Sequence, residues 1–354
     1  MDFTPTEEQT AVRELAGEIF TDRSTHERLT AAGTGTDGEL WKALCGAGLP
    51  GAVEETGLLG LVLALEEQGR TTAQVPFAVS CAYGVLAVAA HGSAAQRERL
   101  LPALRDGTAV ATGAFPAGAG VRISPDGGLT GVAPLVPWLR DATHVLVAAG
   151  DRTLWWIRVG APGVAVEPVE STAPWSAGRL TLSGARGERM GGPGPDAHED
   201  VLATARTAFA GLQTGVCAGS LARAVAHTTT REQFGRPLST NQGVLLRAAD
   251  AYMETEAIRV TSYEAAWRRD EGLPYRTHAL TAAWWASEAG RRVVHSGQHL
   301  HGGLGADLEH PVHRHFLWGR QIDAHLGCGA ELLEELGTLI VDARAAAGRT
   351  EGVA

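Results

Sequence analysis

The sequence predicts a mainly α-helical protein with a small β domain in its middle and a four-helix bundle at its C-terminal end. Helical periodicity dominates up to about residue 106. Short β-rich runs separated by Gly, Pro and Asp fill residues 107–195, and helical periodicity returns over 196–354. A chain of 354 residues is long enough for two or three packed units. We therefore expect three domains, over 1–106, 107–195 and 196–354.

The first domain begins with a helix signal. Thr4, Pro5 and Glu7 predict a capping box with Pro at the first helical position. Apolar residues then follow at helical spacing: Val12, Leu15, Ile19 and Phe20. The runs "LVLALEEQGR" and "AAQRERLLPALRDG" predict two further amphipathic helices, which end at Gly69 and Gly107.

The middle domain contains the runs "HVLVAAG", "TLWWIRVG", "VAVEPVE" and "GRLTLSGA". Each is short, rich in β-branched or aromatic residues and bounded by turn formers, which predicts a small antiparallel β-barrel or sandwich. The segment "GGPGPDAHED" (Gly191–Asp200) has the composition of a linker that leaves this domain.

In the third domain, Gly211, Gly215 and Gly219 recur every four residues, which predicts a helix that packs closely against another backbone. A second helix carries apolar or small residues at Leu245, Ala249, Tyr252, Val260, Tyr263 and Trp267. "LTAAWWASEAGRRVVHSGQHL" predicts a third helix, and the segment after Arg314 predicts a fourth.

Composition excludes several classes of function. The net charge of −10 leaves no broad basic surface, which argues against nucleic acid as a partner. Four separated cysteines without a C-x-x-C pair favour reduced thiols over disulfides or a zinc ribbon. The N-terminus does not resemble a signal peptide, and the longest aliphatic run, Leu58–Leu65, is too short to cross a bilayer. We expect a soluble cytoplasmic protein that does not associate with membranes.

The segment "TTTREQFGRPLSTNQ" (Thr228–Gln242) is a polar loop between two predicted long helices. A guanidinium such as that of Arg231 can form paired hydrogen bonds with phosphate oxygens. Gly235 and Pro237 predict a non-helical turn after it. The alternative is an ordinary surface loop whose charges form salt bridges.

Several phrases, in this order, resemble the acyl-CoA dehydrogenase family: "ELWKALCGAGLPG", "LEEQGR", "HGSAAQRERLLPALRDG", "REQFGRPLSTNQ" and "HLHGGLGADLEHPVHR". The resemblance implies α-helices, a middle β-barrel and a C-terminal helical bundle. It also implies FAD, an acyl-CoA substrate, an electron-transfer acceptor protein and a dimer or tetramer built on the bundle. In the family reaction, a Glu removes the α-proton while the β-hydrogen leaves as hydride to the flavin.

The resemblance also implies a cofactor site that crosses a subunit interface. In the family, the Arg and Gln of an R-x-Q-F-G loop contact the pyrophosphate and adenosine of a flavin held mainly by the neighbouring subunit. The matching cofactor-binding residues are Arg231, Gln233, Phe234, Gly235, Gln242, His299, Gly302 and Gly303.

Two positions depart from the family in a way that bears on catalysis. The family's catalytic Glu lies either shortly before a Gly-Thr near the C-terminus or immediately before an Arg early in the first bundle helix. The corresponding residues here are Leu326, before Gly327 and Cys328, and Ala205, before Arg206. Neither position carries a carboxylate, so the chain holds no catalytic Glu at either place.

The residues expected around the flavin ring are also changed. The family motif T-E-P-x-x-G-S-D corresponds to "AFPAGAG" (Ala114–Gly120), which lacks the hydroxyl and acidic residues. The W-x-T segment corresponds to Leu135–Pro137, with Pro137 in place of a hydroxyl donor. The usual Gln before the double glycine is His299.

Residues that would serve a partner's flavin are thus kept, whereas those for the chain's own flavin ring and proton abstraction are missing. This asymmetry predicts the subunit without the catalytic Glu in a heteromeric acyl-CoA dehydrogenase, whose partner subunit carries it. The C-terminal part resembles the α2β2 heterotetramers that degrade steroid side chains in actinobacteria, which implies bulky acyl-CoA substrates.

Three alternatives remain open at this stage. A self-sufficient dehydrogenase would use a displaced base such as Glu331, Asp323 or His325. A metal protein would use the i, i+4 pair His295 and His299, although no further ligand stands at standard spacing. A structural pseudoenzyme would stabilise a partner without contacting the cofactor.

Overall fold

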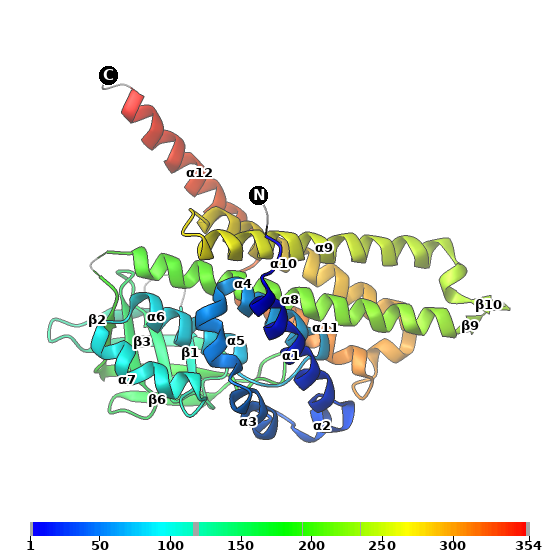
Figure 1. The fold of residues 1–354 in the computed structure, drawn as a ribbon, viewed down its shortest axis with the longest axis horizontal. Helices are drawn as coiled ribbons and strands as arrows, with labels where there is room; N and C mark the ends of the chain where they lie inside the picture. Colours follow the sequence, from blue (N-terminus) through cyan, green and yellow to red (C-terminus); the bar gives the residue numbers. More distant parts are fainter. Residues whose placement is uncertain (1–2, 116–119, 193, 234, 352–354) are drawn as a thin grey trace.

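The structure is a computed structural model that describes residues 3–115, 120–192, 194–233 and 235–351, without the side chains of Leu326 and of residues 343–351. N-terminal helices, a strand-rich middle and long C-terminal helices follow one another in the predicted order (Figure 1). The predicted fold class is therefore confirmed.

The N-terminal helices are α1 (Glu7–Arg23), α2 (His26–Ala31), α3 (Gly38–Gly46), α4 (Leu49–Thr71), α5 (Phe77–Val79), the π-helix η1 (Ser80–Leu86), α6 (Ala87–His91) and α7 (Ala94–Arg105). The predicted capping box at Thr4 was wrong by two residues. Thr6 is the N-cap, because its hydroxyl accepts from the Gln9 amide at 3.2 Å while the Gln9 side chain accepts from the Thr6 amide at 3.0 Å.

The predicted end of α4 was also wrong. The helix continues past Gly69 to Thr71, and Thr72 follows it in the left-handed region at φ 52°. Gly69 serves packing instead, because a Cβ there would overlap the Leu212 carbonyl oxygen on α8. The predicted stop at Gly107 is confirmed. Within the described residues, no single helix is long and apolar enough to cross a membrane. Helices α3 and α4 meet these criteria only when taken as a pair, and that pair is bent by 74°.

The middle of the chain contains eight strands among the described residues: β1 (Ala111–Ala114), β2 (Val121–Ile123), β3 (Leu129–Val136), β4 (His144–Ala148), β5 (Leu154–Arg158), β6 (Val164–Pro168), β7 (Gly178–Ala185) and β8 (Glu188–Met190). They form two four-stranded sheets, ordered β1-β4-β5-β8 and β2-β3-β7-β6. Val145 and Ile157 of the first sheet share an apolar core with Leu180 and Leu182 of the second.

The prediction that these strands are all antiparallel needs one correction. β1 and β4 are parallel, with Ala111 opposite His144, whereas the other pairs are antiparallel. A parallel pair needs a long connection. Here β2 and β3, which belong to the other sheet, form it.

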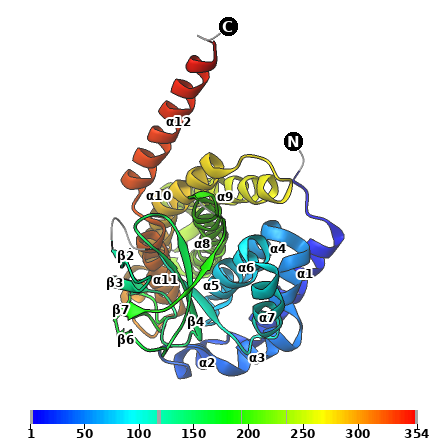
Figure 2. The same cartoon turned by 90° about the vertical axis from the view of Figure 1, so that its left-hand side faces the viewer.

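The C-terminal helices are α8 (Asp196–Thr230), α9 (Gln242–Asp270), α10 (Arg276–Leu300), α11 (Pro311–Leu326) and α12 (Gly329–Glu351), with the short hairpin β9 (Glu232–Gln233) and β10 (Arg236–Pro237) and the 3₁₀ turns η2 (Leu238–Thr240) and η3 (Gly302–Ala306). Helices α8 to α11 correspond to the four predicted helices. The predicted linker Gly191–Asp200 is too long, because α8 begins inside it. Helix α12 is additional and projects from the body of the protein (Figures 1 and 2).

The glycine stripe on α8 lies directly against α4, as predicted. A Cβ on Gly211 would come within 2.8 Å of Val62, and a Cβ on Gly215 would overlap the Glu66 carbonyl oxygen. On Gly219, a Cβ would overlap the Arg70 carbonyl oxygen and the ring of His315. The three glycines of α8, which have no side chains, therefore allow α4 and α8 to approach closely.

Replacing Gly215 by Ala is expected to destabilise the protein by about 1–3 kcal/mol, because the added methyl group has to displace helix backbone. Gly337→Ala on α12 is the matched control, since nothing lies within 4 Å of the added Cβ. That change should be neutral or stabilise the chain by up to about 1 kcal/mol. Urea denaturation of both variants measures the difference, and equal midpoints would contradict the packing role of the stripe.

A buried carboxylate joins the same two helical regions. Glu66 on α4 is 4% exposed and accepts hydrogen bonds from Arg259 of α9 at 2.7 and 3.1 Å. It also accepts from Arg70 at 2.9 Å and from the Tyr263 hydroxyl at 2.9 Å. The negative charge is thus fully partnered, which is the condition under which a buried carboxylate is tolerated.

Candidate cofactor and substrate sites

The polar loop predicted to bind a cofactor lies at one end of the long helices α8 and α9, whereas the two sheets lie near the other end of α8 (Figure 1). Helix α8 ends at Thr230, and β9 and β10 form a tight hairpin with Gly235 at φ 75° between them. The Leu238 amide donates to the Arg231 carbonyl at 2.9 Å and closes the loop. Phe234 lies outside the described residues.

The predicted cofactor residues in this region are solvent-exposed: Arg231, Gln233, Gly235, Gln242, His299, Gly302 and Gly303. Within the described part of the chain, the side chains of Arg231 and Gln233 have no hydrogen-bond or ion-pair partner. A Cβ on Gly302 or Gly303 would meet nothing within 4 Å, and Gly302 adopts φ 60°. An external ligand can therefore approach this backbone closely.

One aromatic contact joins the loop to the double-glycine turn. His227 lies one helical turn before Arg231, whose amide donates to the His227 carbonyl at 2.9 Å. The His227 ring stacks on that of His301, with ring centroids 4.7 Å apart and planes at 23°. His301 directly precedes Gly302. The two predicted halves of the cofactor site therefore meet through these histidines.

A separate cleft of about 760 Å³ lies between the β domain, η1, α8 and α11. Ala205 and Arg206 of α8 line it, as do His325 at the end of α11 and Gly327. Tyr83 projects from η1, and its ring packs 5.3 Å from Phe115, which in turn lies 5.5 Å from His198. π-Helical segments often occur at functional sites, and burial raises the pKa of Tyr83, so its hydroxyl stays protonated.

The β-domain wall of this cleft is mostly apolar as far as it is described. Its residues are Gly113, Phe115, Gly120, Val132, Ala133, Pro134, Leu135, Ala148, Ala149, Gly150 and Arg152. None of these side chains is a hydroxyl or a carboxylate. Of the predicted flavin-ring motif Ala114–Gly120, residues 116–119 lie outside the described part. Apart from Arg152, the described wall offers a flavin ring only apolar contact and backbone groups.

The two positions that the resemblance matches to the family's catalytic carboxylate lie at this cleft. Ala205 lines it and is 2% exposed. Leu326 is the last residue of α11, between the cleft-lining His325 and Gly327, and its side chain lies outside the described residues. The departures read from the sequence therefore fall at the cleft itself.

Of the three candidate displaced bases, the structure brings Glu331 and His325 to the cleft. Glu331 is the only carboxylate among the described lining residues, and its side chain has no hydrogen-bond or ion-pair partner there. Burial lowers the pKa of His325 to about 4, so the ring is neutral at pH 7. Asp323 instead accepts from the Ser287 hydroxyl at 2.6 Å and pairs with Arg320 at 3.2 Å.

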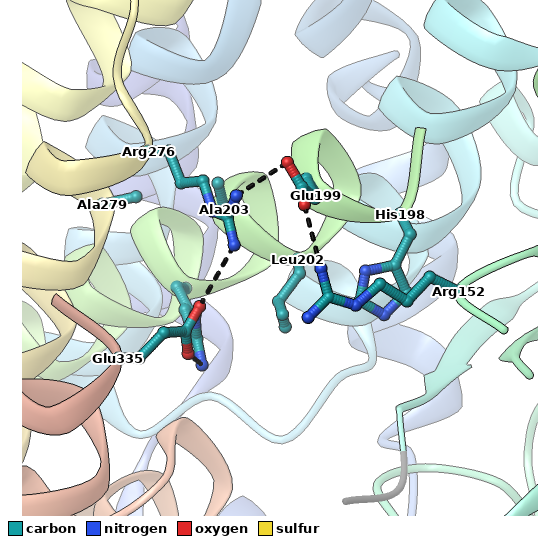
Figure 3. A pocket seen from close by; sticks show the side chains of 9 residues that line it. Arg152, His198, Glu199, Leu202, Ala203, Arg276, Ala279 and Glu335 are labelled. Carbon is teal, nitrogen blue, oxygen red and sulfur yellow. Dashed lines mark hydrogen bonds and ion pairs between the residues drawn. The ribbon is translucent and has the colours of Figure 1, made fainter. Parts of the chain in front are cut away.

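Sequence reasoning missed an ionic pocket of about 150 Å³ that adjoins the cleft (Figure 3). Glu199 pairs with Arg152 at 3.1 Å and with Arg276 at 2.7 Å. Glu335 of α12 accepts from both terminal nitrogens of Arg206, at 3.0 and 2.7 Å. Burial alone would raise the pKa of Glu335, but the hydrogen bonds and charge of Arg206 hold it below its usual value.

The pocket could not have been found in the sequence, because its five charged residues come from the β4–β5 turn, α8, α10 and α12. Apart from Arg206, which follows Ala205, none of these residues belongs to a motif noted in the sequence. For the metal alternative, the described residues contain no cluster of three or more His, Cys, Asp or Glu side chains that could hold an ion. The His295 ring packs on Phe316 instead, with centroids 4.9 Å apart.

The loop and the cleft cannot serve one cofactor within a single chain. Ala205 lies on α8, and Arg231 directly follows the last residue of that helix, 26 positions further along the chain. This separation corresponds to about 39 Å along the helix. That is further than an extended dinucleotide reaches. A flavin in this chain's cleft therefore cannot contact Arg231 of the same chain.

Two family models and known relatives match the chain over most of its length. The family model of the acyl-CoA dehydrogenase N-terminal domain matches residues 6–108, and that of the C-terminal domain matches residues 192–329. Acyl-CoA dehydrogenase FadE27 of Mycobacterium tuberculosis is 35% identical over 381 residues, which cover 95% of this chain and 98% of that protein.

Two solved structures are similar over nearly the whole chain. The Tcur3481-Tcur3483 steroid ACAD G363A variant matches with a TM-score of 0.90 and 41% identity, covering 96% of this chain and 99% of that one. The ChsE4-ChsE5 complex from Mycobacterium tuberculosis matches with a TM-score of 0.90, 31% identity and the same coverage. On the match to FadE27 and to both domain models, the chain belongs to the acyl-CoA dehydrogenase family, whose members are FAD-dependent oxidoreductases acting on acyl-CoA thioesters.

Proposed function

We propose that this chain is the subunit without the catalytic carboxylate in a heteromeric acyl-CoA dehydrogenase, and that its loop completes the FAD site of a partner subunit. One observation carries the proposal: the phosphate-binding half of the family's site is open and unpaired, whereas the chemical half has lost its carboxylates. Arg231 and Gly302 represent the first half. Ala205 and the apolar wall represent the second.

The residues of the loop fit the phosphates of FAD. The guanidinium of Arg231 would form paired hydrogen bonds with phosphate oxygens. The Gln233 amide would reach the adenosine side, and the exposed backbone at Gly302 and Gly303 would allow close approach. Gln242, His299 and Gly235 lie in the same exposed region and complete the set. FAD supplies the hydride acceptor of the reaction, and the partner would supply the base.

An unusually apolar outer face of α9 supports assembly with a partner. Its exposed large residues are Leu245 at 55%, Leu246 at 57%, Tyr252 at 59%, Met253 at 61% and Val260 at 48%. A contiguous apolar patch is typical of an interaction surface. Three of these positions, Leu245, Tyr252 and Val260, are among those that predict this helix from the sequence. We assign the face to the second acyl-CoA dehydrogenase-like subunit in a heterotetramer.

The substrate class follows from the relatives rather than from the cleft. The similar Tcur3481-Tcur3483 structure is a steroid acyl-CoA dehydrogenase by its title. We therefore propose a bulky, steroid-type acyl-CoA bound in the partner's site, with reoxidation by an electron-transfer acceptor protein. The four cysteines are free in the structure, which supports a reducing cytoplasm as the location.

A second candidate function has one specific observation in its favour. Glu331 lines the cleft and has no partner among the described residues. It stands near the N-terminus of α12. A carboxylate at this place could remove an α-proton from a thioester bound in this chain. The protein would then be a self-sufficient dehydrogenase with a displaced base.

Glu331→Gln in the co-purified complex separates the two candidates. We expect acyl-CoA turnover to change less than about twofold, because the base lies on the partner, whereas loss of a general base costs about 10²–10⁴-fold. Glu334→Gln is the matched control, as it lies on the same helix but does not line the cleft. A loss of turnover with Glu331→Gln alone would establish the displaced base instead.

A further inference from the structure

Three contacting histidine rings form a stack directly behind the loop, in which the planes of the first pair are at 23° and those of the second pair are tilted at 59°. His227 of α8 stacks on His301 at 4.7 Å, and His301 contacts His310 with ring centroids 4.9 Å apart. His301 is 5% exposed, whereas His227 and His310 are half-buried. The stack thus runs from the end of α8, through the residue before Gly302, to the N-cap of α11.

Hydrogen bonds fix the role of one nitrogen in two of the rings. The Gly297 carbonyl can only accept, so the Nδ1 of His301 donates to it at 2.7 Å. The Nδ1 of His310 accepts from the Val312 amide at 3.3 Å, so its proton is on Nε2. His227 has no side-chain hydrogen bond within the described residues, which leaves its ring nitrogens available to an external group.

The charged groups around the stack are mostly cationic. Arg231, directly after α8, acts on His227, and Arg223 of α8 acts on His310, whereas Asp307, before α11, is the acidic group facing His310. Burial, the neighbouring His301 and these arginines lower the pKa of His227 and of His310 below the usual value of histidine, and Asp307 opposes the shift at His310. In the free chain the surroundings of His227 and His310 therefore disfavour the charged imidazolium.

We infer that His227, supported by His301 and His310, is part of the surface that receives the phosphates of the partner's FAD, and that cofactor binding takes up a proton there. This rests on the proposed function of the loop. A dianionic pyrophosphate near Arg231 reverses the local electrostatics, because it favours the charged imidazolium that the neighbouring cations disfavour. A protonated His227 then donates from both ring nitrogens.

The expected pH dependence follows from linkage. Binding that raises the pKa of a histidine takes up protons in the window between the free and bound values of that pKa. The affinity for FAD therefore falls as the pH rises through this window and becomes constant above it. With one coupled group, the dependence is at most about tenfold per pH unit.

The test is calorimetric titration of FAD into the flavin-depleted complex at pH 6.5, in two buffers with different heats of ionisation. We expect an uptake of about 0.3–1 proton per FAD for one coupled histidine. His227→Gln should remove at least half of that uptake and weaken binding about 3- to 10-fold at pH 6.5, but less than about twofold at pH 8.5.

His278→Gln on α10 is the matched control, because this half-buried histidine faces Glu264 and lies at the other end of the helix from His301. It should leave proton uptake and affinity unchanged. Zero proton uptake by the wild-type complex, or equal uptake by His227→Gln, would overturn the inference. Neither result would affect the proposed function, which is tested separately by the dependence of FAD binding on Arg231.

Discussion

Replacing Arg231 by Ala is expected to strip most of the flavin from the assembled complex without dissociating its subunits. The reason is the loss of a charge-assisted bond to phosphate, which contributes about 1.5–3 kcal/mol. This corresponds to a Kd for FAD that is about 10- to 150-fold weaker. The ratio of flavin absorbance to protein absorbance, measured after gel filtration, reports the loss directly.

The control for this change is Arg179→Ala, which removes an exposed arginine from β7, far from the loop. It should leave flavin content unchanged. The same pair of variants tests the alternative of a structural pseudoenzyme. If the Arg231→Ala complex keeps its full flavin content and affinity, the loop does not contact the cofactor and the pseudoenzyme reading is correct.

Replacing Glu66 by Ala is expected to destabilise the chain by about 3–5 kcal/mol, because Arg259, a partly buried cation, loses the more buried of its two carboxylate partners. The Arg259 side chain is 22% exposed and makes three of its hydrogen bonds to this one carboxylate. Tyr263 loses its acceptor at the same time. The urea midpoint of the purified chain measures the change.

Glu188→Ala provides the comparison, since Glu188 pairs with Arg99 on the surface and both side chains are about half exposed. Such a pair contributes about 0–1 kcal/mol. The loss of stability with Glu66→Ala should exceed that with Glu188→Ala by at least about 2 kcal/mol. Equal effects would mean that water replaces the carboxylate at Arg259 and that this tie between α4 and α9 is dispensable.

The order of the three regions could be predicted because periodicity changes at their boundaries and because glycines mark close packing. The α8 stripe is an example: the same missing Cβ atoms that give a four-residue repeat in the sequence admit the backbone of α4 in the structure. The error at the start of α1 arose because two nearby threonines can each act as an N-cap. Thr4 and Thr6 both precede acidic or amide residues, and the helix uses the pair Thr6 and Gln9.

Contacts between segments that are distant along the chain could not be predicted from the sequence. The parallel alignment of β1 with β4 depends on which sheet the intervening strands join. Gly69 is a good helix terminator on its own, but contact with α8 keeps it inside α4. In both cases tertiary contacts outweigh the local signal.

Some residues of the candidate sites could likewise be predicted from local motifs, whereas others depend on tertiary contacts. The proposed loop residues, and the proposed loss of the catalytic carboxylate at Leu326 and Ala205, could be predicted from the sequence because each lies within a local motif of the resemblance. The position of Glu331 in the cleft and the stacking of His227 on His301 depend on how helices end and turn. The ionic pocket joins four elements and leaves no local trace.

The central claim is that this chain completes a flavin site whose base lies on another chain, and counting flavins tests it most directly. The chain would be purified alone and co-purified with its dehydrogenase-like partner, and FAD would be quantified per polypeptide. We predict little FAD on the chain alone and one FAD for every two polypeptides in the complex. One FAD per polypeptide on the chain alone, with dehydrogenase activity, would contradict the account.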